Sequence, residues 1–479
     1  MKKLYVPGVL ALVYFVVSWC AAWFFLDPTH VDIVIVGGGL AGMAAALEAH
    51  ARNPSLHIVL LEKEGKVGGN SAKASSGINA AKSPDDVDLY LQDTLRSGGG
   101  LSNPTLALTL VNNSLDGIRF LESHGMDLSV QCQLGGHSTD RTRRNKSGPN
   151  VGFAIVSTLH RAIDAASSQI QVVTNAHVAK LLAHDHTMAG VEYVADDGTE
   201  HVLSAPAVIL ATGGYSANKA LLRSLAPGME AFATTNGPWA TGDGLHLATD
   251  VGASLIHTDK VQLHPTGFID PKDRKKGTRF LAPEALRGAG GVLLNVDGRR
   301  FVNELATRKE VSTAMLQQRH QSSFLVLLQT PQVLDACKAL GLAFYEAIGL
   351  VRVLPDLEAL AQAMAVPRSV LEDTFDTYLR AARGESPDAF GRMAFASARE
   401  LCPMYVMEVE PVVHYCMGGV QINQHAEVML ENHGVVHGLF AAGEVSGGLH
   451  GNNRLGGNSL AECVVFGRLA GQRATAFVR

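Results

Sequence analysis

The residues best suited to chemistry lie between positions 264 and 454, where charged or imidazole side chains stand beside glycines. The set comprises His264, Glu284, Arg287, Arg308, His414 and Arg454. An arginine side chain presents a rigid fork of donors, which suits bidentate capture of a carboxylate. Together these residues predict a binding site for a small dianion, although each one alone has an ordinary interpretation as a loop or capping residue.

Arg308 lies in the segment NELATRKE, residues 303–310. Its ordinary interpretation is a surface cation, because Glu304 precedes it by four residues and the two side chains could pair on one helical face. Exposed helical pairs of this kind contribute only about 0.3–0.5 kcal/mol. Two interpretations of Arg308 are therefore open, a surface ion pair and a role in chemistry.

The elements that must position this set begin with a dinucleotide-binding unit. Residues 31–36 are apolar and β-branched, as expected for a buried parallel strand. In the following GGGLAG, Gly37 permits the tight turn, Gly39 lets backbone amides approach a pyrophosphate, and Gly42 allows close packing of a helix. A second strand ends at Glu62, which is placed to bind a ribose. The motif does not distinguish NAD from FAD, and no second unit is visible for a separate nicotinamide.

The composition excludes several other classes of function. Of 479 residues, 47% are hydrophobic and 18% are charged, which predicts a large core divided between two or three domains. The 40 basic and 45 acidic residues give a net charge of −5, so nothing favours nucleic acid as a partner. None of the six cysteines forms a C-x-x-C pair, so we predict no zinc ribbon, no dithiol redox motif and no metal site.

The N-terminal residues predict an association with a membrane. Residues 6–26 are apolar and carry no charge, a length sufficient to span a bilayer as a helix. Lys2 and Lys3 favour a cytosolic N-terminus, with the remainder translocated. We predict a signal anchor over residues 1–30; the alternatives are a signal peptide cut near Cys20 to Ala22 and a buried helix. Because the segment is not Arg-rich and amphipathic, the endoplasmic reticulum or secretory side is favoured over the mitochondrion.

The stretch EKEGKVGGNSAKASSGINAA, residues 62–81, resembles the flavin-binding segment of the succinate dehydrogenase and fumarate reductase flavoprotein superfamily. Two further matches are AVILATGGYS, residues 207–216, and the segment 437–471, whose helix start faces the pyrimidine end of the flavin in that family. The resemblance implies FAD as the cofactor. Covalent members carry a histidine in the first stretch, and none lies between Gly68 and Ala81 here, so we expect non-covalent FAD.

The motif and the resemblance together define the candidate cofactor-binding residues. They are Gly37, Gly39, Leu40, Ala41, Gly42, Glu62, Lys63, Gly69, Asn70, Ser71, Ser76, Gly77, Ile78, Asn79, Thr212, Gly213, Gly214, Asp243, Gly443, Glu444, Asn458, Ser459 and Leu460.

From about Val31 to Gly471 the chain resembles the soluble FAD-dependent fumarate reductases, of the yeast type and of the bacterial flavocytochromes. The resemblance implies reduction of fumarate to succinate by hydride transfer from flavin N5. It implies that His264, His414 and Arg454 bind the substrate carboxylates. It also implies that Arg308 delivers the proton and is resupplied through Glu284 and Arg287. An arginine acid is unusual, because a guanidinium is essentially always protonated.

The chain departs from the family pattern in two respects. Pro283 stands where related bacterial enzymes have a threonine that touches substrate, which puts that contact in doubt. No haem domain is present, so the electron donor is unidentified; a reduced flavin, a quinone and a partner reductase are all open. Two alternatives are kept. One is a membrane-tethered flavoprotein that exchanges electrons with a protein, as in oxidative folding, and the other is a related flavin enzyme for another unsaturated acid.

The expected fold is α/β, with an N-terminal hydrophobic helix followed by a Rossmann-like FAD-binding domain that carries an inserted α+β capping domain. We place the FAD-binding domain at residues 31–258 and 414–479 and the mobile cap at residues 259–413. Helical patterns dominate the insertion and strand signals are few. The segments 261–269 and 410–420 are the expected hinges.

Overall fold

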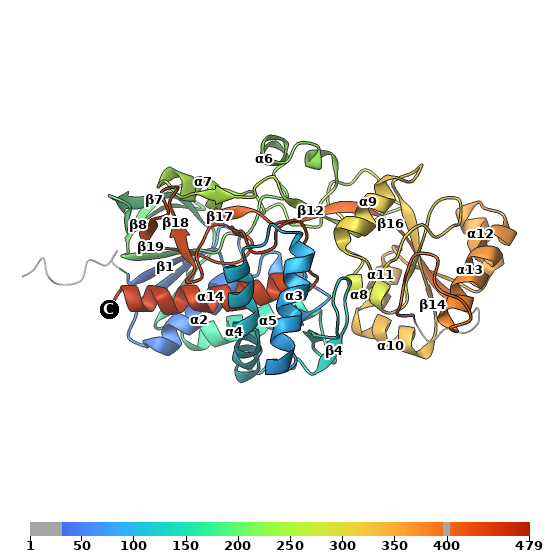
Figure 1. Ribbon diagram of the computed structural model, residues 1–479. Coiled ribbons are helices and arrows are strands. Elements are labelled where there is room, and N and C mark those ends of the chain that lie inside the picture. The colour runs from blue at the N-terminus through green and yellow to red at the C-terminus, as the bar shows by residue number, and fades with distance from the viewer. Residues whose placement is uncertain (1–30, 396–402) are drawn as a thin grey trace, which may run out of the picture.

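The computed structural model describes residues 31–395 and 403–479. They form two lobes, a larger one built from both ends of the chain and a smaller one built from its middle (Figure 1). No helix in the described ranges is long and apolar enough to cross a membrane. Residues 6–26 lie outside those ranges, so the expected N-terminal helix stays a prediction.

The larger lobe is organised around a nine-stranded sheet with the order β6-β2-β1-β10-β19-β8-β7, to which β18 and β9 add. Its parallel part comprises β6 (Ile170–Val173), β2 (Ile58–Leu61), β1 (Ile33–Val36), β10 (Ala207–Leu210) and β19 (Val435–Ala441). Strands β1, β2 and β10 are short apolar runs that are buried along their whole length, as expected for strands covered on both faces. The strand predicted over residues 31–36 is therefore confirmed as β1.

Two helices pack closely together beside this sheet. Helix α2 (Leu40–Arg52) follows β1, and helix α14 (Asn458–Phe477) crosses the lobe next to it (Figure 1). A Cβ atom on Gly467 would lie 2.5 Å from the Ala41 carbonyl oxygen, so only glycine permits this approach. Helix α2 begins just after the carboxyl end of β1, the edge at which ligands of open α/β sheets bind.

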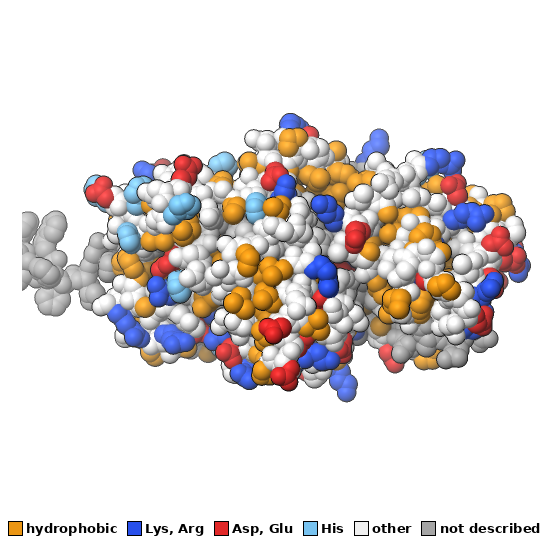
Figure 2. Space-filling view, in the orientation of Figure 1, with side chains coloured by type: hydrophobic (Ala, Val, Ile, Leu, Met, Phe, Trp, Pro, Cys, Tyr) orange, Lys and Arg blue, Asp and Glu red, His pale blue; other side chains and the backbone are white. Residues whose placement is uncertain are grey.

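The rest of the larger lobe covers this core. The covering elements are α3 (Val87–Gly98), α4 (Pro104–Ser123), α5 (Val151–Ala165), α6 (Lys219–Leu225), α7 (Asp243–Asp250), β7 (Ala176–His184), β8 (Thr187–Ala195), β9 (Glu200–Ser204), β18 (Glu427–Met429) and the small sheet of β3 (Ile78–Asn79), β5 (Thr142–Arg144) and β4 (Val130–Cys132). On the face drawn in Figure 2, basic and acidic side chains are interspersed and neither sign gathers into a broad patch.

The smaller lobe contains more sheet than its sequence suggests. Its five strands are β12 (Val261–Phe268), β16 (Met404–Cys416), β14 (Ser323–Leu328), β13 (Val292–Leu294) and β15 (Arg352–Leu354). Its helices are α8 (Glu284–Gly288), α9 (Arg308–Leu316), α10 (Pro331–Ala339), α11 (Leu342–Ala347), α12 (Leu357–Met364) and α13 (Arg368–Ala382). The expectation of few strands was wrong because an apolar run as short as SFLVLL cannot be told from a helical segment by periodicity.

The two segments expected to be hinges lie side by side. Strands β12 and β16 pair antiparallel, with His264 opposite Val412, and both run between the lobes (Figure 1). The register of the pair shifts on either side of His264, which marks bulges that redirect its side chain. The proposed boundary at 413/414 falls inside β16, and the division into domains with a mobile cap stays a prediction.

Candidate functional site

A cavity of about 1460 Å³ connects the glycine-rich turn after β1 with the residues proposed to bind a dianion. At one end it is lined by Gly37, Gly39 and Glu62, and at the other by Arg308 and His414. One continuous space therefore holds both the dinucleotide motif and part of the cationic set.

Most of the candidate cofactor-binding residues line this cavity. They are Gly37, Gly39, Leu40, Ala41, Glu62, Lys63, Gly69, Asn70, Ser71, Ser76, Gly77, Thr212, Gly213, Gly214, Asp243, Gly443, Glu444, Ser459 and Leu460. Four others, Gly42, Ile78, Asn79 and Asn458, are not part of its lining.

Those four residues lie behind the wall of the cavity. A Cβ atom on Gly42 would lie 2.1 Å from the Gly37 carbonyl oxygen, so Gly42 serves the packing of α2. The side-chain nitrogen Nδ2 of Asn79 donates to Asn458 Oδ1 (2.6 Å), which also accepts from the Tyr90 hydroxyl (2.7 Å). These bonds hold the first residue of α14 in place, so Asn79 and Asn458 support the wall in this structure.

The cavity offers donors and open backbone to an anionic ligand. Helices α2 and α14 are both preceded by a glycine, which offers no side-chain cap, and of their first amides that of Leu40 donates to the Ser71 hydroxyl (3.3 Å). The positive ends of both helices can still stabilise a bound anion. A Cβ atom on Gly39 would meet only Ser71 Oγ, at 3.8 Å, which leaves the backbone open to close approach. The Thr212 hydroxyl and the Trp239 indole nitrogen, both on residues of the lining, are buried without a partner among the described groups. This donor set fits a dinucleotide.

The acidic and basic side chains at the dinucleotide end are held by local bonds. The Glu62 carboxylate accepts from the amides of Gly38 and Glu64, both at 2.9 Å. Burial raises the pKa of Glu62, and this effect outweighs the two hydrogen bonds, which lower it. Lys63 donates to Asp243 (2.6 Å), which holds both candidates together in the lining of the cavity.

At the other end of the cavity, Arg308 is positioned as the first residue of helix α9. The Thr307 hydroxyl accepts from the Glu310 amide (3.3 Å) and the Glu310 carboxylate accepts from the Thr307 amide (2.9 Å). This capping box starts α9 at Arg308, which is 4% exposed. Helix α9 packs on β12, so the Arg308 guanidinium is directed toward the strand that carries His264.

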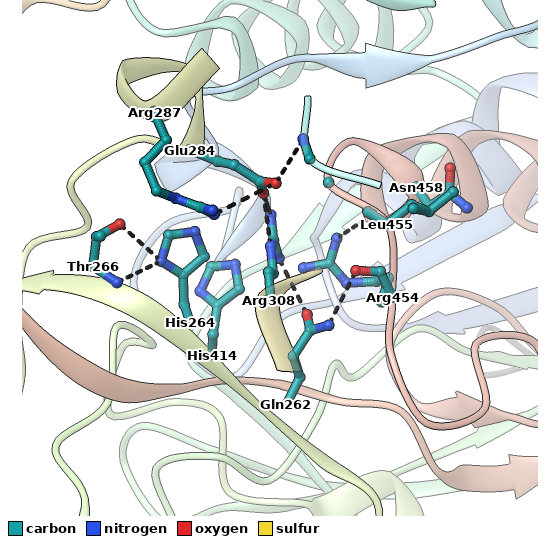
Figure 3. A network of polar contacts seen from close by, with 12 residues as sticks. Gln262, His264, Thr266, Glu284, Arg287, Arg308, His414, Arg454, Leu455 and Asn458 are labelled. Atoms are coloured by element: carbon teal, nitrogen blue, oxygen red, sulfur yellow. Dashed lines mark hydrogen bonds and ion pairs between the residues drawn. The ribbon is translucent and has the colours of Figure 1, made fainter. Parts of the chain in front are cut away.

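Arg308, Glu284 and Arg287 form a buried chain of charges (Figure 3). Glu284 Oε2 accepts from Arg308 Nε (2.7 Å) and Nη2 (2.5 Å), and Glu284 Oε1 lies 3.6 Å from Arg287 Nη2. Burial would raise the pKa of Glu284, but the charges of Arg308 and Arg287 outweigh it and hold this pKa at about 2. Burial lowers the pKa of Arg287, which is fully enclosed. Pro283, just before α8, is also buried.

Gln262 is a member of the site that sequence reasoning missed. Its side-chain oxygen accepts from Arg308 Nη1 (3.1 Å), and its side-chain nitrogen donates to the Arg454 carbonyl oxygen (3.0 Å). It therefore links the two arginines (Figure 3). The available signal was its position two residues before His264, in a segment expected to be a hinge.

The two histidines lie next to each other with ring centroids 5.1 Å apart. His264 Nδ1 accepts from the Thr266 amide (3.2 Å), which assigns the ring proton of the neutral form to Nε2. That Nε2 is buried with no partner in the described structure. His414 Nδ1 lies 2.7 Å from the Thr235 hydroxyl. Burial, and then the charge of Arg308, holds the pKa of both imidazoles well below the usual value, so both are neutral near pH 7.

Arg454 has no carboxylate within ion-pair distance among the described side chains. Its Nη1 donates to the Leu455 carbonyl oxygen (3.1 Å), its Nε is buried without a partner, and its guanidinium lies 4.2 Å from the centre of the Tyr415 ring. Burial, followed by repulsion from Arg308, lowers the pKa of Arg454 to about 10. Figure 3 shows Arg308 between the two histidines and Arg454.

The alternative pairing of Arg308 with Glu304 does not occur. Glu304 precedes α9 and is fully buried, so the two residues do not share a helical face. Its carboxylate instead accepts from Arg300 (2.9 Å) and Arg392 (2.9 Å). The interpretation of Arg308 as an exposed surface cation was therefore wrong.

Comparison with known proteins identifies the family. Residues 32–460 match the FAD binding domain family. The chain is 39% identical to a fumarate reductase of Schizosaccharomyces pombe, over 93% of this chain and 90% of that protein. The chain belongs to the fumarate reductase family of FAD-binding flavoproteins. Fumarate reductase 1 of Saccharomyces cerevisiae is 38% identical, over 92% of this chain and 97% of that protein.

A solved structure agrees with this membership. The open conformation of a flavocytochrome c3 fumarate reductase matches with a TM-score of 0.75 and 32% identity, covering 100% of this chain and 83% of that one. As a member of this family, the protein is an FAD-dependent oxidoreductase that acts on CH–CH groups. The Rossmann-like FAD-binding fold and the FAD cofactor expected from the sequence are thus confirmed, whereas the roles of individual residues stay predictions.

Glu444 predicts a pH dependence of stability in the FAD-free protein. Burial raises its pKa from 4.5 to about 7. The folded state then holds a proton that the unfolded chain releases, so this contribution is complete below pH 4.5 and is lost as the pH rises through 7. In thermal unfolding of the FAD-free protein, Glu444→Gln is expected to gain stability relative to wild type from about pH 5 to pH 8. The exposed Glu431→Gln is the control, and a Glu444→Gln difference that does not vary with pH would contradict the prediction.

Proposed function

We propose that the protein reduces fumarate to succinate. The observation that carries this proposal is the charge of the site beyond the FAD cavity. The guanidinium groups of Arg287, Arg308 and Arg454 have one carboxylate, Glu284, within ion-pair distance among the described residues. Two positive charges are left uncompensated, which matches the charge of a small dicarboxylate.

Substrate binding is assigned to His264, His414 and Arg454. The His264 Nε2 and Arg454 Nε groups are buried donors without partners, and such groups are rare unless a ligand or water satisfies them. Because both imidazoles are neutral near pH 7, they bind carboxylates as hydrogen-bond donors without adding charge. Donors from β12, β16 and the loop before α14 can then hold the two ends of fumarate in one orientation.

Reduced FAD, when bound, supplies a hydride equivalent to one alkene carbon of fumarate. Arg308 donates the proton to the other carbon, where negative charge develops and nearby cations stabilise it. Glu284 contacts both Arg308 and Arg287, so a proton lost from Arg308 can be replaced from Arg287 across that carboxylate. The lowered pKa of Arg287 favours this donation. A guanidinium is already protonated at neutral pH and is a poor base for the reverse oxidation.

The test uses the purified holoenzyme, reduced anaerobically with a stoichiometric amount of dithionite. Fumarate, acrylate, urocanate and oxygen are then added separately, and the return of oxidised flavin absorbance is followed. In a parallel sample, the oxidised holoenzyme is mixed with a reduced dithiol protein, and the loss of that absorbance is followed. Fast reoxidation by fumarate, with stoichiometric succinate, is expected. Faster reoxidation by a monocarboxylate would overturn the proposal in favour of the other-acid alternative, and flavin reduction by the dithiol protein without reoxidation by fumarate would overturn it in favour of the electron-exchange alternative.

We further propose that residues 6–26 attach the protein to a membrane on the secretory side. The support is the charge-free apolar run behind Lys2 and Lys3. The full-length chain is expected to resist extraction from membranes at alkaline pH, and Val13→Asp with Val16→Asp is expected to release it. Release of the wild-type chain would contradict the attachment.

A further inference from the structure

Arg454 lies on the face of a tyrosine ring that is itself fixed by a buried acid. The guanidinium carbon is 4.2 Å from the centre of the Tyr415 ring. The Tyr415 hydroxyl donates to Glu462 Oε2 (2.5 Å), and His450 Nε2 lies 2.9 Å from the same oxygen. We propose that Tyr415, held by Glu462 and His450, is the positioning residue that aims Arg454 at a substrate carboxylate. This inference rests on the proposed role of Arg454 in binding fumarate.

The four residues come from separate parts of the chain and meet where β16 reaches the start of α14. Tyr415 follows His414 on β16, Glu462 lies in the first turns of α14, and His450 and Arg454 belong to the loop between β20 (Ser446–Gly447) and α14. All but Arg454 are joined by hydrogen bonds, and each is at most 5% exposed. The position of the ring therefore depends on the strand, the helix and the loop together.

The Tyr415 ring can hold Arg454 without cancelling its charge. A buried arginine is usually held by a carboxylate, but a carboxylate beside Arg454 would neutralise the positive charge that is needed to bind a substrate carboxylate. An aromatic face attracts a guanidinium through its quadrupole and leaves the net positive charge in place. Within the described ranges the Arg454 guanidinium makes one hydrogen bond, to the Leu455 carbonyl oxygen, and its Nε has no partner. The Tyr415 ring therefore orients the Arg454 guanidinium, which has too few hydrogen bonds to be held by them alone.

Glu462 and His450 fix the plane of the ring. The hydroxyl bond to Glu462 anchors one end of the tyrosine, and the His450 ring meets it edge-on at 5.6 Å and 73°. Burial, and then the charge of Glu462, raises the pKa of Tyr415 well above 10, so its hydroxyl stays protonated and continues to donate. The residues His450, Glu462 and Tyr415 act on Arg454 only through this ring, and none of them is assigned contact with fumarate.

The experiment compares Tyr415→Leu with Tyr415→Phe in the holoenzyme. The measurements are KM and kcat for fumarate and the dissociation constant of malonate, read from its perturbation of the flavin spectrum. Loss of the ring in Tyr415→Leu is expected to raise KM and the malonate constant about tenfold, within the roughly 2- to 30-fold range of such stacking. Tyr415→Phe keeps the ring and is expected to raise both by about twofold to threefold. In both variants kcat at saturating fumarate changes less than KM.

The matched control is Phe120→Leu. Phe120 on α4 stacks on the guanidinium of Arg468 on α14, with the guanidinium carbon 5.0 Å from the ring centre, and neither residue lines the cavity. Phe120→Leu removes this comparable stack outside the site and is expected to leave KM and the malonate dissociation constant unchanged.

Each outcome separates this inference from the proposed function. Wild-type protein that fails to reduce fumarate refutes the proposed function itself. Wild-type protein that reduces fumarate, with malonate constants equal in wild type and both Tyr415 variants, refutes the role of the ring alone. Should Tyr415→Leu lose FAD or fail to fold, Glu462→Gln decides in its place. It keeps the ring and its size but weakens the anchor, and an unchanged malonate constant in Glu462→Gln and Tyr415→Phe would overturn the proposal.

Discussion

Replacing Arg308 with lysine is expected to lower kcat for fumarate reduction by about 10²- to 10⁴-fold, the range that a positioned general acid contributes. Lysine keeps the positive charge, but one ammonium cannot reproduce the fork of Arg308. Two of its nitrogens donate to Glu284, at 2.7 and 2.5 Å, and the third donates to Gln262 at 3.1 Å. A lysine nitrogen would have to leave one of these partners in order to face the substrate.

Turnover is measured with a chemically reduced dye as donor, so that no physiological donor is needed. FAD content and the dissociation constant of malonate are expected to change much less than kcat, because Arg308 is assigned proton delivery and not carboxylate capture. Arg319→Lys is the control, since Arg319 is an exposed arginine of the same lobe, 2.9 Å from Asp297. Near-normal turnover of Arg308→Lys would exclude Arg308 as the proton donor.

The second large effect is expected on stability, from Glu304→Ala. This carboxylate is fully buried and accepts from Arg300, Arg392 and the amide of Leu293. Its removal leaves two guanidinium groups without that partner inside the lobe, and breaking a buried pair in this way costs about 3–5 kcal/mol. We expect the free energy of unfolding of the smaller lobe to fall by that amount.

Hydrogen exchange under increasing denaturant measures this effect locally, since two lobes need not unfold together. Amides of β13 and β14 are the reporters, because these strands pair in the core of the smaller lobe. Glu358→Ala is the comparison, at an exposed glutamate 3.9 Å from Arg368, and is expected to cost less than about 1 kcal/mol. Equal losses in the two variants would show that Glu304 behaves as a surface charge.

The dinucleotide-binding unit could be predicted because its determinants are local. A buried strand, GGGLAG, a helix and a second strand follow one another within about thirty residues. Gly37 and Gly42 are required by close backbone contacts within this unit or next to the neighbouring strand β10, and Gly39 leaves the backbone open to a ligand. The resemblance that selected FAD over NAD also rests on continuous stretches of sequence. Local patterns of this kind retain their meaning without knowledge of the tertiary structure.

The missed features depend on contacts between distant parts of the chain. Gln262 reads as one polar residue in an apolar strand, and only the folded molecule shows it linking Arg308 to the segment of Arg454. Glu304 reads as a helix partner of Arg308, but its partner Arg392 lies 88 positions away. The short strands β13 and β15 are defined by pairing with β14 and β16, not by a periodic pattern of their own.

The two uncompensated charges of the site also affect the protein when no dicarboxylate is bound. Arg308 and Arg454 then repel each other, and this repulsion adds to burial in lowering the pKa of Arg454. A multivalent buffer anion that occupied the site would relieve the repulsion and compete with fumarate. A neutral side chain at position 454, which has no carboxylate partner among the described residues, would remove the repulsion and weaken the binding of a dianion, so affinity and stability without ligand oppose each other at this residue.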